Sequence, residues 1–130
     1  MQYISTRGKA PILDFDDVLL AGLASDGGLY LPDSWPQFDA AFIREMRDLD
    51  YAELAVRVMT PFIGGQIAPD AFADIVDETF RGFTHSAVAP LKQLEANLWL
   101  MELFHGPTLS FKDYPMQLIG RLFDHVLTQK

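Results

Sequence analysis

The sequence predicts an α/β protein of α+β character, in which helices predominate and a few short strands are added. Apolar residues recur at intervals of three and four in several segments, as at Phe72, Ile75 and Val76, which is the spacing of one helical face. The stretch 2–7 alternates between polar and apolar residues, as a strand does. A chain of 130 residues, 49% of them hydrophobic and 22% charged, is long enough to bury one core.

The N-terminal quarter of the chain is expected to contain a strand, a helix and a second extended segment. The strand at 2–7 ends before Gly8. A helix should begin at Asp14, because aspartates in the first turn complement the positive end of the helix dipole. The glycine pair 27–28 supplies a stop for this helix, and the extended piece "LYLP" at 29–32 follows.

Three helices are expected in the middle of the chain, the first of them at 39–49. Asp50, with Glu53 three residues later, has the pattern of a capping box, so the second helix should begin there. Pro61 should end or kink this helix, because proline lacks the N–H that the helix needs. The third helix, at 70–81, is amphipathic.

A hairpin and a last helix complete the predicted elements. The segments "AVAPLKQL" and "NLWLMELF" lie on either side of a turn at 95–97. No strand follows the last helix, although a helix in an α/β layout normally leads to another strand, so we expect the chain to be a fragment. The residues predicted to form the apolar face of this helix, which runs to Thr128, are Met116, Ile119, Leu122, Phe123 and Val126.

The composition excludes several classes of protein. The net charge is −8 and the basic residues are scattered, whereas nucleic-acid binding needs clustered Lys and Arg. The apolar runs are too short to span a membrane, and no signal peptide is visible. The absence of cysteine excludes disulfides and thiolate metal sites, and it suits a cytoplasmic protein.

Other polar residues give only weak signals. His85, His105 and His125 are spread along the chain without the spacing of a metal motif, so we expect no metal site. Arg7 follows the first strand and could bind a carboxylate or phosphate through both guanidinium nitrogens. A salt bridge at the end of the strand is the commoner fate of such an arginine.

Lys112 lies where a helix is expected to begin. Ser110 with Asp113 could form a capping box, or Asp113 could be the cap with Pro115 at the second helical position. Either arrangement places Lys112 near the positive end of the helix, which disfavours its ammonium form, and apolar neighbours such as Phe111 would add desolvation. Only a neutral amine attacks an aldehyde. The alternative is an ordinary surface charge, which is what most lysines beside an aspartate are.

Three segments, in this order along the chain, resemble threonine synthases that carry an extra N-terminal domain. They are "YISTRG" at 3–8, "LAGLASDGGLYLP" at 20–32 and "ELFHGPTLSFKD" at 102–113. The last of these is similar to the motif that carries the pyridoxal-phosphate lysine. The resemblance implies an N-terminal domain at 1–95, followed at 96–130 by the truncated beginning of a catalytic domain of the pyridoxal-phosphate fold type II.

The resemblance also implies a site. Lys112 matches the lysine that forms a Schiff base with pyridoxal 5'-phosphate, and it would be the catalytic residue. Phe111 and Asp113 match its neighbours and would orient it in the cofactor site. Enzymes of this family are carbon–oxygen lyases acting on phosphate, which convert O-phospho-L-homoserine and water to L-threonine and phosphate. The cofactor acts as an electron sink in such reactions.

In this family, the loops that hold the cofactor phosphate lie later in the chain than these 130 residues. The resemblance therefore implies that the chain needs the rest of the enzyme as its partner, and that this part is missing here. Anion binding needs backbone N–H groups in a nest or at a helix start, and a lysine alone does not provide them. We therefore expect this chain to be inactive alone. Two alternatives stay open: a related pyridoxal-phosphate-dependent phospho-lyase, and a non-enzymatic helical interaction module.

Overall fold

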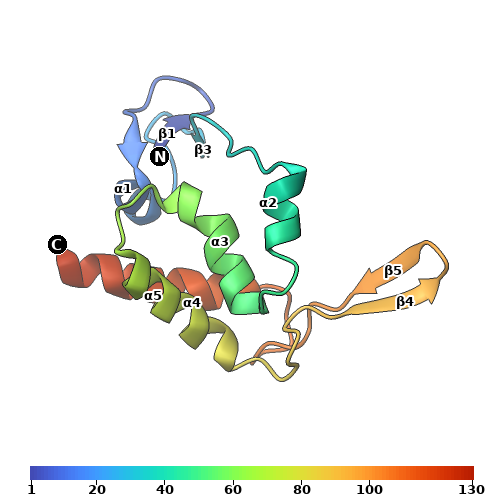
Figure 1. Ribbon diagram of the computed structural model, residues 1–130. Coiled ribbons are helices and arrows are strands. Elements are labelled where there is room, and N and C mark those ends of the chain that lie inside the picture. Colours follow the sequence, from blue (N-terminus) through green and yellow to red (C-terminus); the bar gives the residue numbers. More distant parts are fainter.

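The computed structural model describes residues 1–130 as a helical core with a small sheet on one side and a projecting hairpin (Figure 1). This mixture of helices and short strands confirms the predicted fold class. The elements, in chain order, are β1 (Gln2–Ser5), β2 (Leu13–Asp14), α1 (Phe15–Ala21), β3 (Tyr30–Pro32), α2 (Ala40–Glu45), α3 (Tyr51–Ile63), α4 (Pro69–Arg81), β4 (Leu91–Glu95), β5 (Leu98–Met101) and α5 (Asp113–Gln129).

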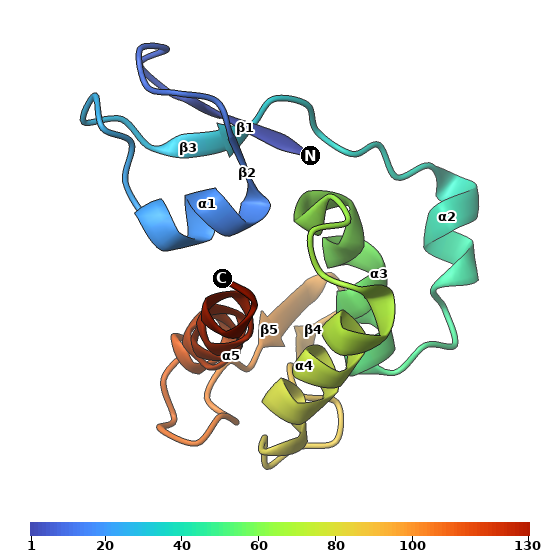
Figure 2. The same ribbon diagram turned by 90° about the vertical axis from the view of Figure 1, so that its left-hand side faces the viewer.

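The first strand, β1, lies at the centre of a three-stranded sheet and pairs antiparallel with both β2 and β3. Its Tyr3 faces Leu13 on one side and Pro32 on the other. The Tyr3 side chain is buried, and its hydroxyl donates to the Phe62 carbonyl at 2.8 Å, which ties the sheet to α3. Helix α1 lies between this sheet and α5 (Figure 2).

The carboxylate of Asp26 organises the loop that follows β1. It accepts hydrogen bonds from the buried Ser5 hydroxyl at 2.8 Å and from the backbone N–H groups of Lys9, Ala10 and Gly28 at 2.9–3.0 Å. Burial acts to raise the pKa of this carboxyl, but the hydrogen bonds, led by that of Ser5, outweigh it and lower the pKa to about 2. The N–H groups of this loop therefore already bind a carboxylate of the protein itself.

Arg7 closes the same loop through a different contact from the ion pair that was expected. Its Nη1 donates to the backbone carbonyl of Asp26 at 3.1 Å. The guanidinium also lies against Gly27, which has a φ of +77° and a backbone conformation that favours glycine. The glycine pair 27–28 thus lies in the connection between α1 and β3, against this loop, and does not end α1, which stops earlier, at Gly22.

The capping box at the start of α3 is confirmed, and Pro61 does not end the helix, which was one of the two effects expected of it. Asp50 accepts from the Glu53 N–H at 2.9 Å, while Glu53 accepts from the Asp50 N–H at 3.0 Å. The helix continues to Ile63 and ends at Gly64, which is left-handed. The missing N–H of Pro61 removes one helical hydrogen bond, but the helix continues for two more residues and the left-handed glycine sets its terminus.

Helix α2 is shorter than the expected span of 39–49. Asp39 caps it by accepting from the Phe42 N–H at 2.8 Å, and the helix ends after Glu45. None of its residues is buried, so no packed face extends the helix beyond its cap.

The hydrophobic core lies between α3, α4 and α5. Val76 on α4 is completely buried, and the Tyr51 and Phe80 rings meet edge to face at 4.8 Å. The apolar spacing that predicted the helix at 70–81 is therefore the core-facing side of α4. The buried members of the core cluster are Ile63, Ile67, Phe72, Val76, Phe80, Phe83, Val88, Leu118 and Leu122.

Helix α5 contributes to this core through a different set of residues from the predicted apolar face. Leu118, Leu122 and Val126 are buried, at a spacing of four, whereas Met116 is 60% exposed. Leu118 and Leu122 belong to the same cluster as Val76, so the contact with α4 decides which side of α5 is buried. The predicted face shares Leu122 and Val126 with the observed one and is wrong at Met116.

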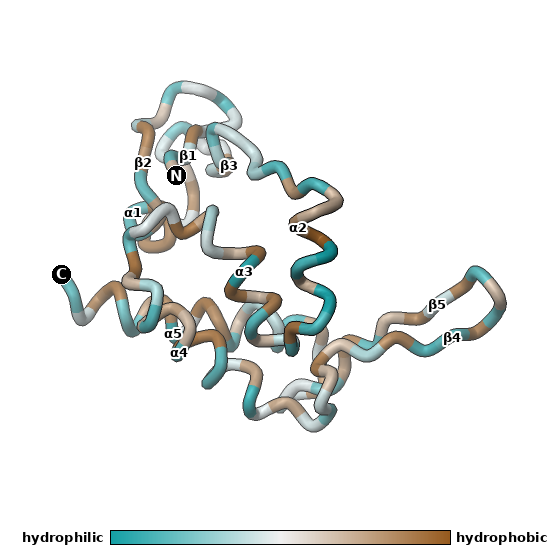
Figure 3. Tube along the Cα trace, in the orientation of Figure 1, coloured by the Kyte–Doolittle hydropathy of each residue, from teal (hydrophilic) through white to brown (hydrophobic).

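The predicted hairpin is confirmed and projects away from the helices (Figure 1). Its strands pair antiparallel from Leu91 and Met101 to Glu95 and Leu98, with one irregularity between Gln93 and Glu95. All residues of β4 and β5 are exposed, although many are hydrophobic (Figure 3). A two-stranded hairpin is marginally stable by itself, so this one depends on its attachment to the helices. No helix has the length and apolarity needed to cross a membrane.

Candidate functional site

Lys112 is presented at the start of α5 by the turn that connects it to β5. It occupies the cap position of the helix, and its carbonyl accepts the first helical hydrogen bond from the Met116 N–H at 3.0 Å. Its own N–H donates to the Ser110 hydroxyl at 3.2 Å, and its side chain is exposed. The expected position at the helix start is thus observed.

Both caps expected from the sequence are wrong by a small shift. The helix begins at Asp113 itself, so Pro115 occupies the third helical position. The first four N–H groups of a helix have no partner within it, so proline loses nothing there. The carboxylate of Asp113 does not cap the helix, because it turns back to Thr108.

Asp113 closes the turn that carries the lysine. Its side chain is buried and accepts from Thr108 twice, from the N–H at 2.8 Å and from the hydroxyl at 2.7 Å. Burial acts to raise the pKa of this carboxyl, but the hydrogen bonds from Thr108 and its neighbours outweigh it, so the pKa is lowered. A Cβ on Gly106 would lie within 2.5 Å of Asp113 Oδ2, so this turn requires a glycine.

The apolar neighbours of Lys112 do not shield it within this chain. Phe111 is 62% exposed and Leu109 is 70% exposed, contrary to the desolvation expected from them. Leu109 has a φ of +62°, a left-handed conformation that is unusual for a residue with a side chain. Its N–H donates to the Gly106 carbonyl at 3.1 Å, which helps to hold this conformation.

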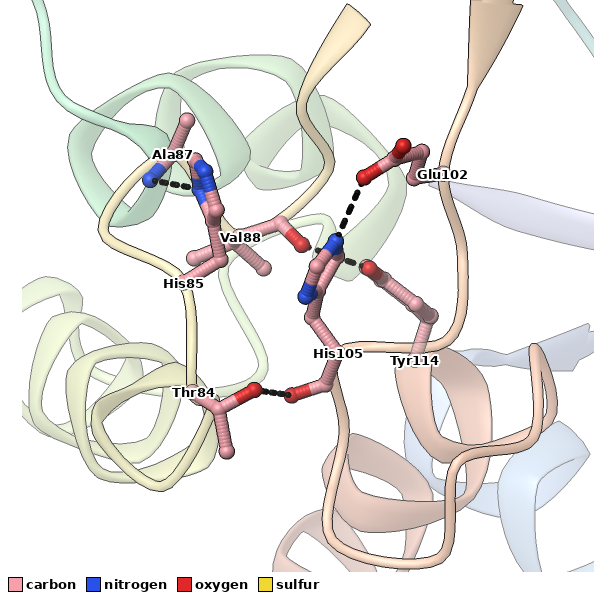
Figure 4. Close-up of polar contacts among 7 residues, drawn as sticks. All are labelled: Thr84, His85, Ala87, Val88, Glu102, His105 and Tyr114. Atoms are coloured by element: carbon pink, nitrogen blue, oxygen red, sulfur yellow. Dashed lines mark hydrogen bonds and ion pairs between the residues drawn. The ribbon is translucent and has the colours of Figure 1, made fainter.

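Residues 105–114, which we call the lysine segment, are held at both ends by residues 84–88, which we call the strap (Figure 4). At one end, the Thr84 N–H and hydroxyl donate to the His105 carbonyl at 2.9 and 3.2 Å. At the other end, the Tyr114 hydroxyl donates to the Val88 carbonyl at 2.6 Å. The strap joins α4 to the hairpin, so it connects the core to the lysine segment.

A carboxylate and two imidazoles lie beside this junction. Glu102 Oε2 is 2.9 Å from His105 Nε2, and these side chains are only 21% and 16% exposed. The ring of His85 lies 4.9 Å from that of His105, and its Nδ1 accepts from the Ala87 N–H at 3.1 Å. No group of three or more His, Cys, Asp or Glu side chains is arranged to hold a metal ion.

The contacts between the strap and the lysine segment could not be predicted from the sequence. Thr84 and His105 are 21 residues apart, and Val88 and Tyr114 are 26 apart, so no local pattern indicates either pair. The spacing of three between Glu102 and His105 was a local signal that could have suggested their contact.

Comparisons with known proteins show what this chain is similar to. The profile of the family described as "Threonine synthase N terminus" matches residues 2–80. A threonine synthase of Pseudomonas aeruginosa is 59% identical over the whole of this chain, which spans 28% of that relative's length. A threonine synthase of Schizosaccharomyces pombe is 40% identical, again over the whole chain and 26% of the relative.

Solved structures agree with the sequence comparisons. A pyridoxal-phosphate-bound threonine synthase from Brucella melitensis matches with a TM-score of 0.98 and 56% identity, over 99% of this chain and 28% of that one. The threonine synthase of Escherichia coli matches with a TM-score of 0.83 and 29% identity, over the whole chain and 29% of that structure. Because the family profile covers more than half of these 130 residues, and because both the sequence and the fold agree with it, the chain belongs to the threonine synthase family.

Proposed function

We propose that this chain is the N-terminal part of a pyridoxal-phosphate-dependent threonine synthase, a lyase of threonine biosynthesis. The whole enzyme converts O-phospho-L-homoserine and water to L-threonine and phosphate, and we place it in the cytoplasm. The observation that carries the proposal is the match along 99% of the chain to the pyridoxal-phosphate-bound enzyme of Brucella melitensis, at a TM-score of 0.98.

In this proposal Lys112 binds the cofactor covalently and is the catalytic residue. Its exposed amine takes part in no ion pair, and its backbone is fixed on both sides by hydrogen bonds, so the side chain is available on a rigid support. The cofactor, when bound, supplies the electron sink. We propose that the amine of Lys112 also moves the protons at Cα and Cβ of the substrate, because an exposed amine without an ion-pair partner can act as a general base.

Phe111 and Asp113 are proposed to complete the support of the lysine. Asp113 acts through the turn, because its carboxylate is fully engaged with Thr108 and its neighbours. Phe111 is exposed beside Lys112 and is free to cover the bound cofactor. We keep both residues in the proposed cofactor site on this basis.

Much of the lysine segment is already engaged in its own hydrogen bonds. The N–H groups of Thr108, Leu109, Lys112 and Asp113 all donate within the turn itself. We therefore propose that most of the backbone N–H groups that hold the cofactor phosphate belong to another part of the enzyme. We propose that residues 1–95 are the N-terminal domain, that 96–130 begin the fold type II catalytic domain, and that these 130 residues alone are inactive.

The test is the substitution Lys112→Ala in the full-length protein, with Lys92→Ala on the exposed hairpin as the matched control. Loss of the lysine should remove the visible absorbance of lysine-bound pyridoxal phosphate and lower threonine formation by roughly 10²–10⁴-fold or more. Borohydride reduction followed by peptide mass spectrometry should place the cofactor on Lys112. The proposal fails if Lys112→Ala keeps the absorbance and the activity of the control.

The 130-residue chain itself gives a second test. Titrated with pyridoxal phosphate, it should show only weak absorbance that Lys112→Ala and Lys92→Ala lower to the same extent. A tight site that depends on Lys112 would show that this part of the enzyme holds the cofactor without the rest.

A further inference from the structure

We propose that Glu102 and His105 form a positioning pair that holds the lysine segment against the strap and thereby sets where the amine of Lys112 lies. The proposal rests on the proposed function of Lys112. It assigns a role to two residues that do not themselves contact the cofactor in this proposal. Figure 4 shows the pair beside the hydrogen bonds of the strap.

Glu102 provides the fixed end of the pair. Its N–H donates to the Pro90 carbonyl at 3.0 Å, so its backbone continues the pairing of the hairpin by one residue. Its carboxylate then meets the ring of His105, which also lies 4.6 Å from the ring of Phe104. The imidazole is therefore held between the end of β5 and its own aromatic neighbour.

His105 transmits this restraint to the start of the lysine segment. Its carbonyl accepts both hydrogen bonds from Thr84, so a rotation of the His105 backbone would break two contacts with the strap. The seven residues that follow are closed by the bonds from Leu109 to Gly106 and from Thr108 to Asp113. A displacement of the backbone at His105 should therefore also displace Lys112, because the hydrogen-bonded turns between them restrict how the backbone can rearrange.

The charges around His105 explain why the pair is more than a surface contact. Glu102 and His105 are largely shielded from water, and a hydrogen bond that involves a charged group is about twice as strong as a neutral one. The facing group on the strap is His85, whose Nδ1 accepts from the Ala87 N–H. The carboxylate of Glu102 is thus the acidic group that the ring of His105 contacts.

The variants separate the charge of the pair from its contact with the strap. Glu102→Gln keeps the size of the side chain and removes its charge. Thr84→Val removes one hydroxyl bond to His105 while the backbone N–H bond stays. Glu95→Gln makes the same charge change on an exposed residue of β4 and is the matched control. All are made in the full-length protein.

The first measurement is amide hydrogen exchange in the cofactor-free protein. In Glu102→Gln the hydrogen-bonded amides of Thr84, Thr108, Leu109 and Lys112 should exchange roughly tenfold faster, the effect of losing one charge-assisted hydrogen bond. In Thr84→Val the same amides should exchange faster by a smaller factor, because the bond that is lost joins two neutral groups. Amides of α4 should keep the exchange rates of the parent protein. Glu95→Gln should change neither region.

The second measurement follows the cofactor at saturation. If the pair positions Lys112, Glu102→Gln lowers the fraction of bound pyridoxal phosphate that shows the lysine-bound visible band. It should also lower kcat roughly tenfold, while KM for O-phospho-L-homoserine changes less than twofold. A role that is structural only would lower the amount of cofactor bound and leave the band of the bound fraction unchanged.

Each outcome decides the matter. Faster exchange with the altered band supports the positioning pair, and no change in either measurement overturns it. Faster exchange with an unaltered band also overturns it, because the pair is then only structural. If α4 also exchanges faster in Glu102→Gln, that variant has disturbed the core, and Thr84→Val is used in its place. An unaltered visible band in Thr84→Val then overturns the proposal. If Lys112→Ala keeps the band, the proposed function fails, and the claim about Lys112 falls with it.

Discussion

The buried carboxylate of Asp113 accepts two hydrogen bonds from Thr108, from the N–H at 2.8 Å and from the hydroxyl at 2.7 Å. These bonds join residues five positions apart in the sequence, and Lys112 lies next to the point of closure. The lysine is exposed, yet the backbone on which it stands is fixed to the first turn of α5. A reactive amine on a flexible side chain gains from such a support, because the helix and the loop set where it can reach.

The contact between Asp113 and Thr108 should make the lysine segment sensitive to acid. Hydrogen bonding lowers the pKa of Asp113 in the folded chain, so its stabilising effect is fully present above the unfolded pKa, near 3.9, and is lost as the pH falls through the lower folded pKa. Protection of the Thr108 amide, measured relative to the intrinsic exchange rate at each pH, should therefore fall below about pH 4. Asp113→Asn should remove this pH dependence, whereas Asp124→Asn, on the exposed side of α5, should keep it. Hydrogen exchange at a series of pH values is the measurement.

Gly106 and Gly120 should respond in opposite ways to alanine. A Cβ on Gly106 meets the Asp113 carboxylate within 2.5 Å, while a Cβ on Gly120 meets nothing within 4 Å. We expect Gly106→Ala to cost about 1–3 kcal/mol of unfolding free energy through overpacking. Gly120→Ala should stabilise α5 by up to about 1 kcal/mol, because alanine has the higher helix propensity. Urea unfolding of both variants measures these changes in unfolding free energy. Equal midpoints would show that the turn relaxes around the added methyl group.

Ser5 should control the acidity of Asp26 at the other end of the chain. Several hydrogen bonds lower the pKa of Asp26 from 3.8 to about 2, and the bond from the Ser5 hydroxyl has the largest effect among them. The loop between β1 and β2 therefore keeps its full stability above pH 3.8 and loses it as the pH falls toward 2. Ser5→Ala should raise the pKa of Asp26 toward its ordinary value, while Ser34→Ala should not. NMR titration of the carboxyl groups measures the pKa of Asp26 in both variants. An unchanged pKa in Ser5→Ala would mean that the backbone N–H donors, and not Ser5, lower it.

The features that could be predicted from the sequence depend on neighbours along the chain. Asp50 and Glu53 are three residues apart, and their capping box is formed as expected. The turn at 95–97 connects its two strands directly, and the hairpin is present. The position of Lys112 at a helix start followed from Ser110, Asp113 and Pro115 near it, and the two caps that were considered lie within two residues of the observed one. Such local signals involve few alternatives, because both partners are close before folding begins.

The features that could not be predicted depend on contacts between distant segments. The hydrogen bonds from Thr84 to His105 and from Tyr114 to Val88 join residues more than 20 positions apart. No spacing in the sequence distinguishes these partners from other polar residues. The exposure of Phe111 was missed for a similar reason, since its surroundings are set by how α5 meets the rest of the molecule. The family motif is the basis on which Lys112 is proposed as the cofactor lysine, but it did not show what holds its turn.

The buried face of α5 provides a direct test of this difference in the 130-residue chain. The sequence pattern assigned Met116 to the core and left out Leu118, whereas the structure buries Leu118 and leaves Met116 60% exposed. Leu118→Ala should lower the free energy of unfolding by about 2–5 kcal/mol, because it opens a cavity against α4. Met116→Ala, the matched control, should change it by about 0.5 kcal/mol or less. Urea unfolding followed by circular dichroism gives both values, and a larger loss for Met116→Ala would mean that α5 is rotated about its axis relative to α4.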